Sequence, residues 1–156
     1  MHVGALSIMA FSGLLLWQGQ VRAAGDLNLA VRSSFLSRYV WRGASVEGKP
    51  VLQQSVNLSG RGLSLDLWSN FDLSRSDGIN ELDVTAGYVR SVKGFNLECG
   101  LVYYTFPNTS AGGTTELYLG VTRTSALNPW FRLYRDIRLA DGAYCGLGIA
   151  PVIPCP

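Results

Sequence analysis

The chain has very few of the residues on which most enzymes and nucleic-acid-binding proteins depend. It contains a single histidine, His2, close to the N-terminus. A His-based catalytic triad, an imidazole general base and a histidine metal ligand are therefore excluded from the rest of the chain. Charged residues make up only 15% of the sequence, and 13 basic against 11 acidic residues leave no basic field for a nucleic acid. We predict a protein that is not an enzyme, binds no nucleic acid and has no cofactor or metal ion.

The acidic residues and the cysteines show no metal-site spacing. The segment 72–78 resembles a calcium-binding loop, but Asp77 stands where an EF-hand has glycine, and no glutamate closes the loop. A solvated surface loop is the simpler interpretation. The three cysteines, Cys99, Cys145 and Cys155, match no metal motif, although Cys145 and Cys155 are close enough in sequence to bridge a small loop.

The N-terminal segment has the features of a signal peptide. Residues 3–17 are apolar apart from serine and glycine, and Val21-Arg22-Ala23 provides a small-residue cleavage site. The alternative is a transmembrane anchor, which takes at least about 18 apolar residues, and the run is shorter than that. We therefore predict a signal peptide at 1–23 and an exported mature chain.

The rest of the chain alternates apolar and polar residues in a series of segments separated by turns. In the first segment, Leu27–Arg42, apolar residues predominate at odd positions and the arginines fall at even ones. Successive strand residues point to opposite faces, so each segment has one apolar and one polar face. The first segment is long for a soluble strand of about five or six residues, and it is long enough to cross a bilayer, which takes about nine to eleven. The other segments are 51–59, 63–71, 81–88, 95–103, 116–122, 131–137 and 143–149.

This pattern predicts an all-β fold, an antiparallel up-and-down transmembrane β-barrel of about eight strands that is either complete or part of a larger barrel. The barrel domain is expected at 24–150. An irregular tail follows at 151–156, where two prolines exclude a central strand.

The connections agree with this prediction, because long ones alternate with short ones. Outer-membrane barrels have long external loops and short periplasmic turns. The last connection, 139–141, is short and interrupts the alternation. The long connections are 43–49, 72–79 and 107–113, the short ones are 60–62 and 92–94, and 124–128 is intermediate.

Charged residues on the polar faces are the candidate functional groups. In a wide lumen they would be wet and would set ion selectivity, whereas in a closed eight-stranded barrel they would pair tightly. The predicted lumen-facing residues are Arg32, Arg38, Arg42, Asp66, Asp83, Glu98 and Glu116.

Aromatic residues fall near the ends of the segments, where barrels carry girdles of half-wet rings. The alternative is that aromatic residues simply favour strands. The predicted external girdle is Tyr39, Trp41, Phe71, Tyr103, Tyr104 and Phe106, and the predicted periplasmic girdle is Tyr88, Phe95, Trp130 and Phe131.

Several stretches together carry a resemblance to a known family. They are Ser37–Gly43, Gly48–Gln53, Asp77–Asp83, Tyr104–Thr109, Thr115–Val121, Tyr134–Asp136 and Gly142–Tyr144. Over roughly residues 27–145 the chain resembles the TorF-type porins, a proteobacterial family of exported proteins. The resemblance implies a barrel in the lipid of the bacterial outer membrane that passes small polar solutes, and it implies no catalytic residue. It leaves the oligomeric state open.

The C-terminus departs from this family, whose members resemble longer barrels that end in an aromatic strand. The chain ends in Pro151-Val152-Ile153-Pro154-Cys155-Pro156. We expect a truncated or frame-shifted member that lacks its last strands, the alternative being a complete eight-stranded barrel whose interior is filled by side chains. Three functions follow: a porin, a non-conducting small barrel with a structural or adhesive role, and a soluble exported β-sandwich that binds a ligand.

Overall fold

The computed structural model describes residues 9–11, 14–22, 26–75 and 78–152, and every regular element in them is a β-strand. No helix in these ranges is long and apolar enough to cross a membrane. The prediction of an all-β antiparallel fold is therefore confirmed.

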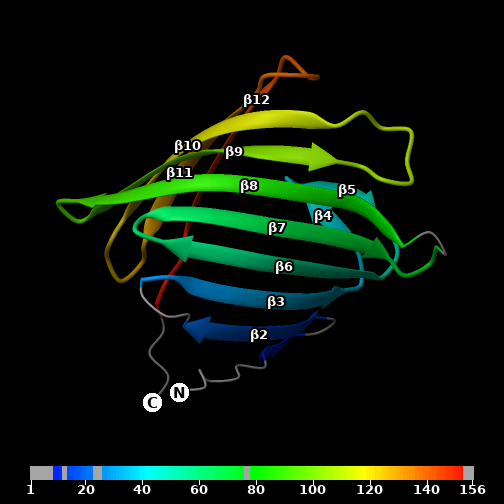
Figure 1. Cartoon of the computed structure of the whole chain (residues 1–156), viewed down its shortest axis with the longest axis horizontal. Helices are drawn as coiled ribbons and strands as arrows, with labels where there is room; N and C mark the ends of the chain where they lie inside the picture. The colour runs from blue at the N-terminus through cyan, green and yellow to red at the C-terminus, as the bar shows by residue number, and fades with distance from the viewer. Residues whose placement is uncertain (1–8, 12–13, 23–25, 76–77, 153–156) are drawn as a thin grey trace.

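Ten strands form one antiparallel sheet, and neighbours in the sheet follow the chain order (Figure 1). The sheet is open, because β1 and β12 are its two edges. The strands are β1 (Met9–Phe11), β2 (Leu14–Arg22), β3 (Asn28–Leu36), β6 (Val51–Gly60), β7 (Leu63–Asp72), β8 (Ile79–Val92), β9 (Phe95–Thr105), β10 (Thr114–Arg123), β11 (Pro129–Asp136) and β12 (Ala143–Ile149).

The segment predicted as a signal peptide contributes β1 and β2. Strand β2 pairs with β3 along its whole length, from Leu14 opposite Leu36 to Arg22 opposite Asn28. The cleavage after Ala23 remains a prediction. If the segment is removed, β3 becomes the first edge strand, and eight long strands remain in the sheet.

The strand register sorts the side chains into two faces of opposite character. One row across β6 to β10 consists of apolar residues, Leu58, Leu65, Ala86, Leu101 and Leu117, each opposite the next. We call this the outer face, and its leucines are exposed, Leu65 by 51% and Leu117 by 48%.

The opposite face, here the inner face, carries the polar residues. A row across β7 to β11 reads Asp66, Thr85, Val102, Glu116 and Asp136. The buried polar residues of the described part of the chain lie on the inner face, among them Glu116 at 6% and Asp136 at 7% exposure. The usual arrangement of a soluble sheet, apolar side chains inside and polar side chains outside, is therefore reversed.

The connections alternate in length as the sequence predicted. At one end of the sheet, the two-residue turns Arg61-Gly62 and Lys93-Gly94 have positive φ at both positions, 51° and 84°, then 48° and 80°, as a type I′ hairpin turn requires. At the other end, the last connection runs from 137 to 142. It is longer than the expected 139–141, because β11 ends at Asp136, so the alternation continues to the last hairpin.

The predicted single strand Leu27–Arg42 is wrong. Strand β3 ends at Leu36, and the chain then forms a separate two-stranded sheet of β4 (Tyr39–Trp41) and β5 (Ala44–Glu47). Residues 37–38 interrupt the strand, and an interruption of two residues leaves the parity of the alternation unchanged. The alternation in the sequence therefore continues across residues 37–38, although the strand does not.

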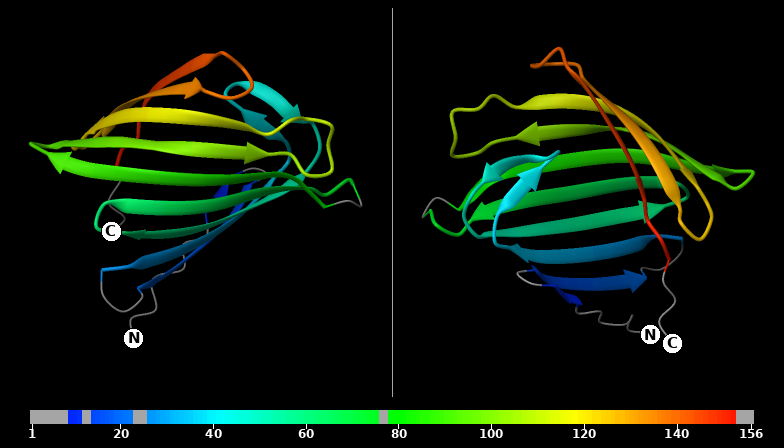
Figure 2. Two further views of the ribbon diagram at one scale, coloured as in Figure 1. Left: turned by 45° about the horizontal axis from the view of Figure 1, so that its top comes forward. Right: turned by 180° about the vertical axis from the view of Figure 1, so that it is seen from behind.

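The β4–β5 hairpin lies against the inner face of the large sheet. Figure 2, in the view from behind, shows the hairpin in front of the sheet, on the side over which β11 and β12 curl. Its turn, Arg42-Gly43, is again of type I′, with φ of 49° and 83°. The connection between β3 and β6, which includes the expected external loop 43–49, thus places Arg42 at the tip of a hairpin that faces the polar side chains.

The close approach of strands on the inner face makes one glycine a test of the fold. A Cβ on Gly100 would lie 2.7 Å from the hydroxyl of Tyr118 and would press on the carbonyl oxygen of Ala86. We expect Gly100→Ala to lower the free energy of unfolding by about 1–3 kcal/mol, the cost of overpacking. Urea unfolding followed by tryptophan fluorescence measures it. Gly48→Ala is the control, since nothing lies within 4 Å of its added Cβ, and equal effects of the two substitutions would contradict the register.

Candidate functional site

Two cavities lie on the inner face, one on each side of the hairpin tip. The first has a volume of about 590 Å³ and reaches toward the Glu98 and Trp130 side chains. The second has a volume of about 460 Å³ and reaches toward Thr114 and Asp136 at the loop end of the sheet. The residues that line both are Tyr39, Trp41, Arg42, Tyr104 and Tyr144.

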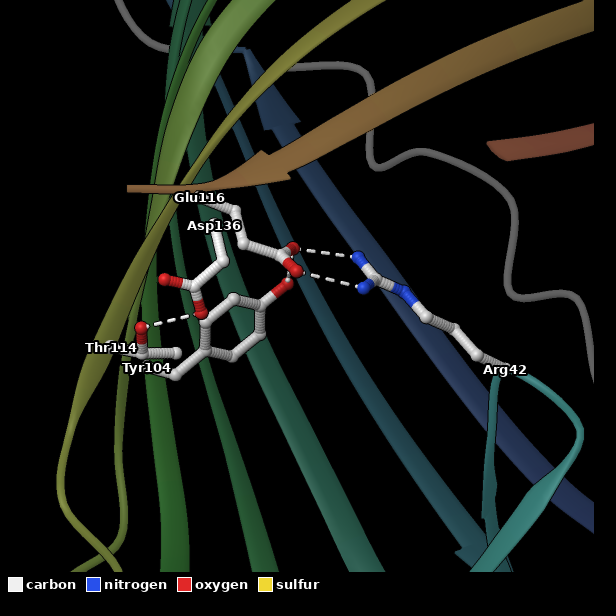
Figure 3. Close-up of polar contacts among 5 residues, drawn as sticks. All are labelled: Arg42, Tyr104, Thr114, Glu116 and Asp136. Atoms are coloured by element: carbon white, nitrogen blue, oxygen red, sulfur yellow. Dashed lines mark hydrogen bonds and ion pairs between the residues drawn. The ribbon is translucent and has the colours of Figure 1, made fainter. Parts of the chain in front are cut away.

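Arg42 forms a two-pronged ion pair across the space between the hairpin and the sheet. Its two terminal nitrogens donate to the two carboxylate oxygens of Glu116 on β10, at 2.8 and 2.6 Å (Figure 3). The Tyr104 hydroxyl on β9 donates to the same carboxylate at 2.9 Å. A parallel pair of charge-assisted bonds to a planar guanidinium is the strongest geometry available to a carboxylate. The pair is well shielded, with side-chain exposures of 15% and 8%.

Aromatic rings enclose the same guanidinium. Its central carbon lies 4.2 Å from the ring centre of Trp41, 4.3 Å from that of Tyr144 and 4.6 Å from that of Tyr134. Each distance is within the range of a cation–π contact. The rings come from the hairpin, β12 and β11, so the guanidinium is held by three separate parts of the chain.

Asp136, at the end of β11, holds the strands next to this ion pair together. Its carboxylate accepts a hydrogen bond of 2.6 Å from the Thr114 hydroxyl (Figure 3) and bonds of 2.9 and 3.0 Å from the backbone N–H groups of Arg138 and Leu139. These bonds join β10, β11 and the connection that follows. They hold β11, and with it the Tyr134 ring, against β10.

The first cavity has its own polar groups. Arg132 donates to both carboxylate oxygens of Glu98, at 2.8 and 3.1 Å, and Ser55 donates to Asp66 at 3.1 Å. Asp83 is different, because its Oδ1 is buried and has no hydrogen-bond partner among the described residues. A buried carboxylate oxygen without a hydrogen-bond donor is costly, so this position favours a donor from the cavity.

The surroundings of the hairpin change the pKa values of Tyr39 and Arg42. Burial, followed by the negative charge of Glu81, raises the pKa of Tyr39 above its usual value, so the Tyr39 hydroxyl stays protonated at neutral pH. Burial lowers the pKa of Arg42, but the hydrogen bond to Glu116 and the negative charge of that carboxylate together raise the pKa by more, so Arg42 keeps its charge.

The structure brings together some of the predicted lumen-facing residues and leaves two apart. Arg42, Asp66, Asp83 and Glu98 line the first cavity, and Glu116 lines the second together with Arg42. Arg32 and Arg38 are exposed and line neither cavity. Arg38 follows the end of β3 in the break before the hairpin, so strand alternation does not govern its direction.

The aromatic residues also divide between the two faces. Tyr39 and Tyr104, predicted in the external girdle, are 6% and 7% exposed on the inner face. Trp41, Phe106 and Trp130 line the cavities rather than an outer belt. Of the predicted girdle residues, the exposed ones are Trp41, Tyr88, Phe95, Tyr103 and Phe131.

Sequence reasoning missed the residues that complete the site. Tyr134, Tyr144 and Asp136 enter the sequence analysis only within the stretches that resemble a known family, and nothing in the sequence pattern marks Arg132. One local signal marks the hairpin, because Arg42-Gly43 is a basic residue followed by glycine, like the turns Arg61-Gly62 and Lys93-Gly94.

The described residues hold no group of three or more histidine, cysteine or acidic side chains arranged for a metal ion. Cys99 and Cys145 are free and exposed. Asp77 and Cys155, named above for a calcium loop and a disulfide, lie outside the described residues.

The fold and site define an all-β protein whose polar residues face inward around a caged arginine. The chain belongs to a family of bacterial proteins of unknown function, Gcw_chp, whose model matches residues 20–131. Neither the curated proteins nor the solved structures gave a match.

The pairing of Arg42 with Glu116 is measurable by a double-mutant cycle of Arg42→Ala and Glu116→Ala. We expect a coupling free energy of about 1–3 kcal/mol in urea unfolding, because the pair is shielded and two-pronged. The pair Arg61–Asp26, with side chains 84% and 72% exposed, is the control and should couple by less than about 1 kcal/mol. Equal coupling in the two cycles would contradict the caged geometry.

Proposed function

We propose that this protein is an outer-membrane β-barrel of porin type that passes small polar solutes along its inner face. The observation that carries the proposal is the reversed distribution of side chains, with apolar residues on the outer face and buried polar residues on the inner face. A chain in water gains little from this arrangement, whereas a chain surrounded by lipid needs it.

The outer face fits a lipid-facing surface in size and continuity. Every strand from β6 to β12 presents exposed large apolar residues on it, among them Leu67, Leu97, Leu119 and Leu147. A contiguous apolar surface of this extent marks an interaction surface rather than the exterior of a soluble monomer. The outer-membrane resemblance and the predicted signal peptide favour lipid as the partner.

A soluble β-sandwich is less well supported. A sandwich buries the apolar face of each sheet against the other sheet. Here the hairpin lies against the polar face, and among the described residues no second layer covers the apolar face. The remaining alternative, a non-conducting barrel, is favoured by the tight pairing of Arg42 with Glu116 and of Arg132 with Glu98, and conductance in planar bilayers separates it from a porin.

Cell fractionation tests the location directly. We expect the mature chain in the outer-membrane fraction and resistant to carbonate extraction, because lipid removes the outer face from water. Immunoblots of soluble, inner-membrane and outer-membrane fractions measure this. Recovery as a soluble periplasmic protein would exclude the barrel.

Arginine substitutions on the outer face distinguish lipid from water. Leu65→Arg and Leu119→Arg replace side chains that are 51% and 62% exposed. In water such changes typically alter stability by about 0.5 kcal/mol or less, whereas near the bilayer midplane arginine costs about 2–4 kcal/mol. We expect the larger loss, measured by urea unfolding from lipid vesicles. Val84→Arg, on the same face, should behave alike.

Leu139→Arg provides the matched control, since Leu139 is 64% exposed but lies in the connection 137–142 at the loop end of the sheet. There the cost should fall to about 0–1 kcal/mol. If all four substitutions are tolerated equally, the outer face does not contact lipid.

A further inference from the structure

The side chains around the Arg42 guanidinium are arranged like a ligand-binding site, and Arg42 itself occupies the position of the ligand. The large sheet supplies one carboxylate, Glu116, one hydroxyl, Tyr104, and two rings, Tyr134 and Tyr144. These groups come from four adjacent strands, β9 to β12, and form a fixed wall. The group they hold is a guanidinium from a residue 74 positions away in the sequence.

The hairpin that delivers Arg42 has no backbone ladder to the large sheet in the described part of the chain. Side chains attach it. Tyr39 packs on Trp68 with ring centres 5.7 Å apart, and Trp41 packs edge-on to Tyr104 at 6.1 Å. The hairpin is therefore a part of the β3–β6 connection that side-chain contacts hold in place. Arg42 can separate from Glu116 and the surrounding rings without breaking a strand.

The position of Arg42 coincides with the boundary between the two cavities, since it lines both. Among the ionisable residues that line them, the carboxyl groups outnumber the arginines. They are Asp66, Asp83, Glu98, Glu81, Glu116 and Asp136, against Arg42 and Arg132. A concave surface lined mainly by one sign of charge concentrates ions of the opposite sign, so cations gather at this boundary.

We propose that Glu116, Tyr104, Tyr134 and Tyr144 form a binding site for solutes that carry a guanidinium group, and that Arg42 occupies this site as an internal competitor. The proposal rests on the proposed function for the path by which such a solute arrives. A solute that displaces Arg42 frees the hairpin tip and joins the two cavities. The wall thus selects the cation, and the hairpin closes the path in its absence.

The geometry favours guanidinium over ammonium. A planar guanidinium matches the two oxygens of Glu116 with parallel hydrogen bonds and stacks against aromatic rings, whereas an ammonium is a compact and strongly hydrated point charge. The other side of the pocket presents the ring faces of Tyr134 and Tyr144 to the guanidinium, and a ring face gives a strongly hydrated cation little to replace its water.

The test is calorimetric titration of the purified full chain in detergent with methylguanidine, at millimolar concentrations far below those that denature proteins. We expect Arg42→Ala to bind one equivalent with a dissociation constant of roughly 1 mM, and the unmodified chain to bind at least about tenfold more weakly, because a tethered competitor has a high effective concentration. Arg38→Ala removes an exposed arginine of the same connection and should behave like the unmodified chain.

Two further arms identify the site and the ligand. Glu116→Gln in the Arg42→Ala background should weaken binding of methylguanidine by at least about tenfold, and methylammonium should bind Arg42→Ala at least about tenfold more weakly than methylguanidine. Far-UV circular dichroism establishes that each variant keeps its strand content, and Arg42→Gln replaces Arg42→Ala if the latter loses it.

The outcomes separate this proposal from the proposed function. Equal affinity of Arg42→Ala and the unmodified chain, or indifference to Glu116→Gln, would overturn the caged-competitor site. Equal affinity for methylammonium would overturn the choice of guanidinium. Binding as expected by a chain that fractionates as soluble protein would leave the site standing and refute the porin.

Discussion

The structure depends on one constraint, the two-residue period of the strand, applied so that polar side chains face inward and apolar side chains face outward. The core shows its consequence. In the part of the chain whose burial the structure describes, the buried hydrophobic residues are Tyr39, Val51, Val102 and Tyr104, while Asn70 and Asp72 are more deeply buried than the leucines. At about 25 cal/mol per Å² of apolar surface removed from water, the outer face contributes its stabilisation only when something other than water covers it. The fold therefore requires a partner for that face, which we propose to be lipid.

An inner face made of polar groups brings a second requirement, because buried charges must be paired or hydrogen-bonded. Cross-strand pairs meet this requirement at several positions, whereas Asp83 Oδ1 has no donor among the described residues. Glu98 is held by Arg132 on β11, and Asp136 by Thr114 on β10. Glu116 has no basic residue opposite it in either register, where Val102 and Asp136 stand. Its partner comes from the hairpin instead. Arg42 thus supplies the basic partner that the strand register does not provide for Glu116. Because Glu116 has no other basic partner, the wall is also a site for an external cation.

The strands, the two faces and the short turns could be predicted from the sequence, because each depends on residues that are close together in the chain. Alternation placed Asp66, Asp83, Glu98 and Glu116 on one face, and the structure puts all four at the cavities. It misled at residues 27–42, where a break of two residues preserves parity. It also assigned Tyr104 to a girdle, although its neighbour Tyr103 is the residue that faces outward. Which connection folds back, and which carboxylate it meets 74 residues away, depends on long-range contacts that no local pattern encodes.

The two edge strands of the sheet carry unpaired backbone groups, and these groups decide whether the fold is compatible with a lipid environment. Strand β12 has a paired neighbour on one side only, and the same holds for β1, or for β3 if the N-terminal segment is removed. In water such an edge is satisfied by solvent, but in hydrocarbon each unpaired backbone group costs several kcal/mol. A membrane-inserted state must therefore pair both edges. The curl that carries β11 and β12 over the inner face turns one edge toward the other (Figure 2), and the ring–cation contacts of Tyr134 and Tyr144 with Arg42 stabilise that curl. In the membrane-inserted state that we propose, the hairpin arginine would link closure of the sheet to occupancy of the proposed site on its inner face.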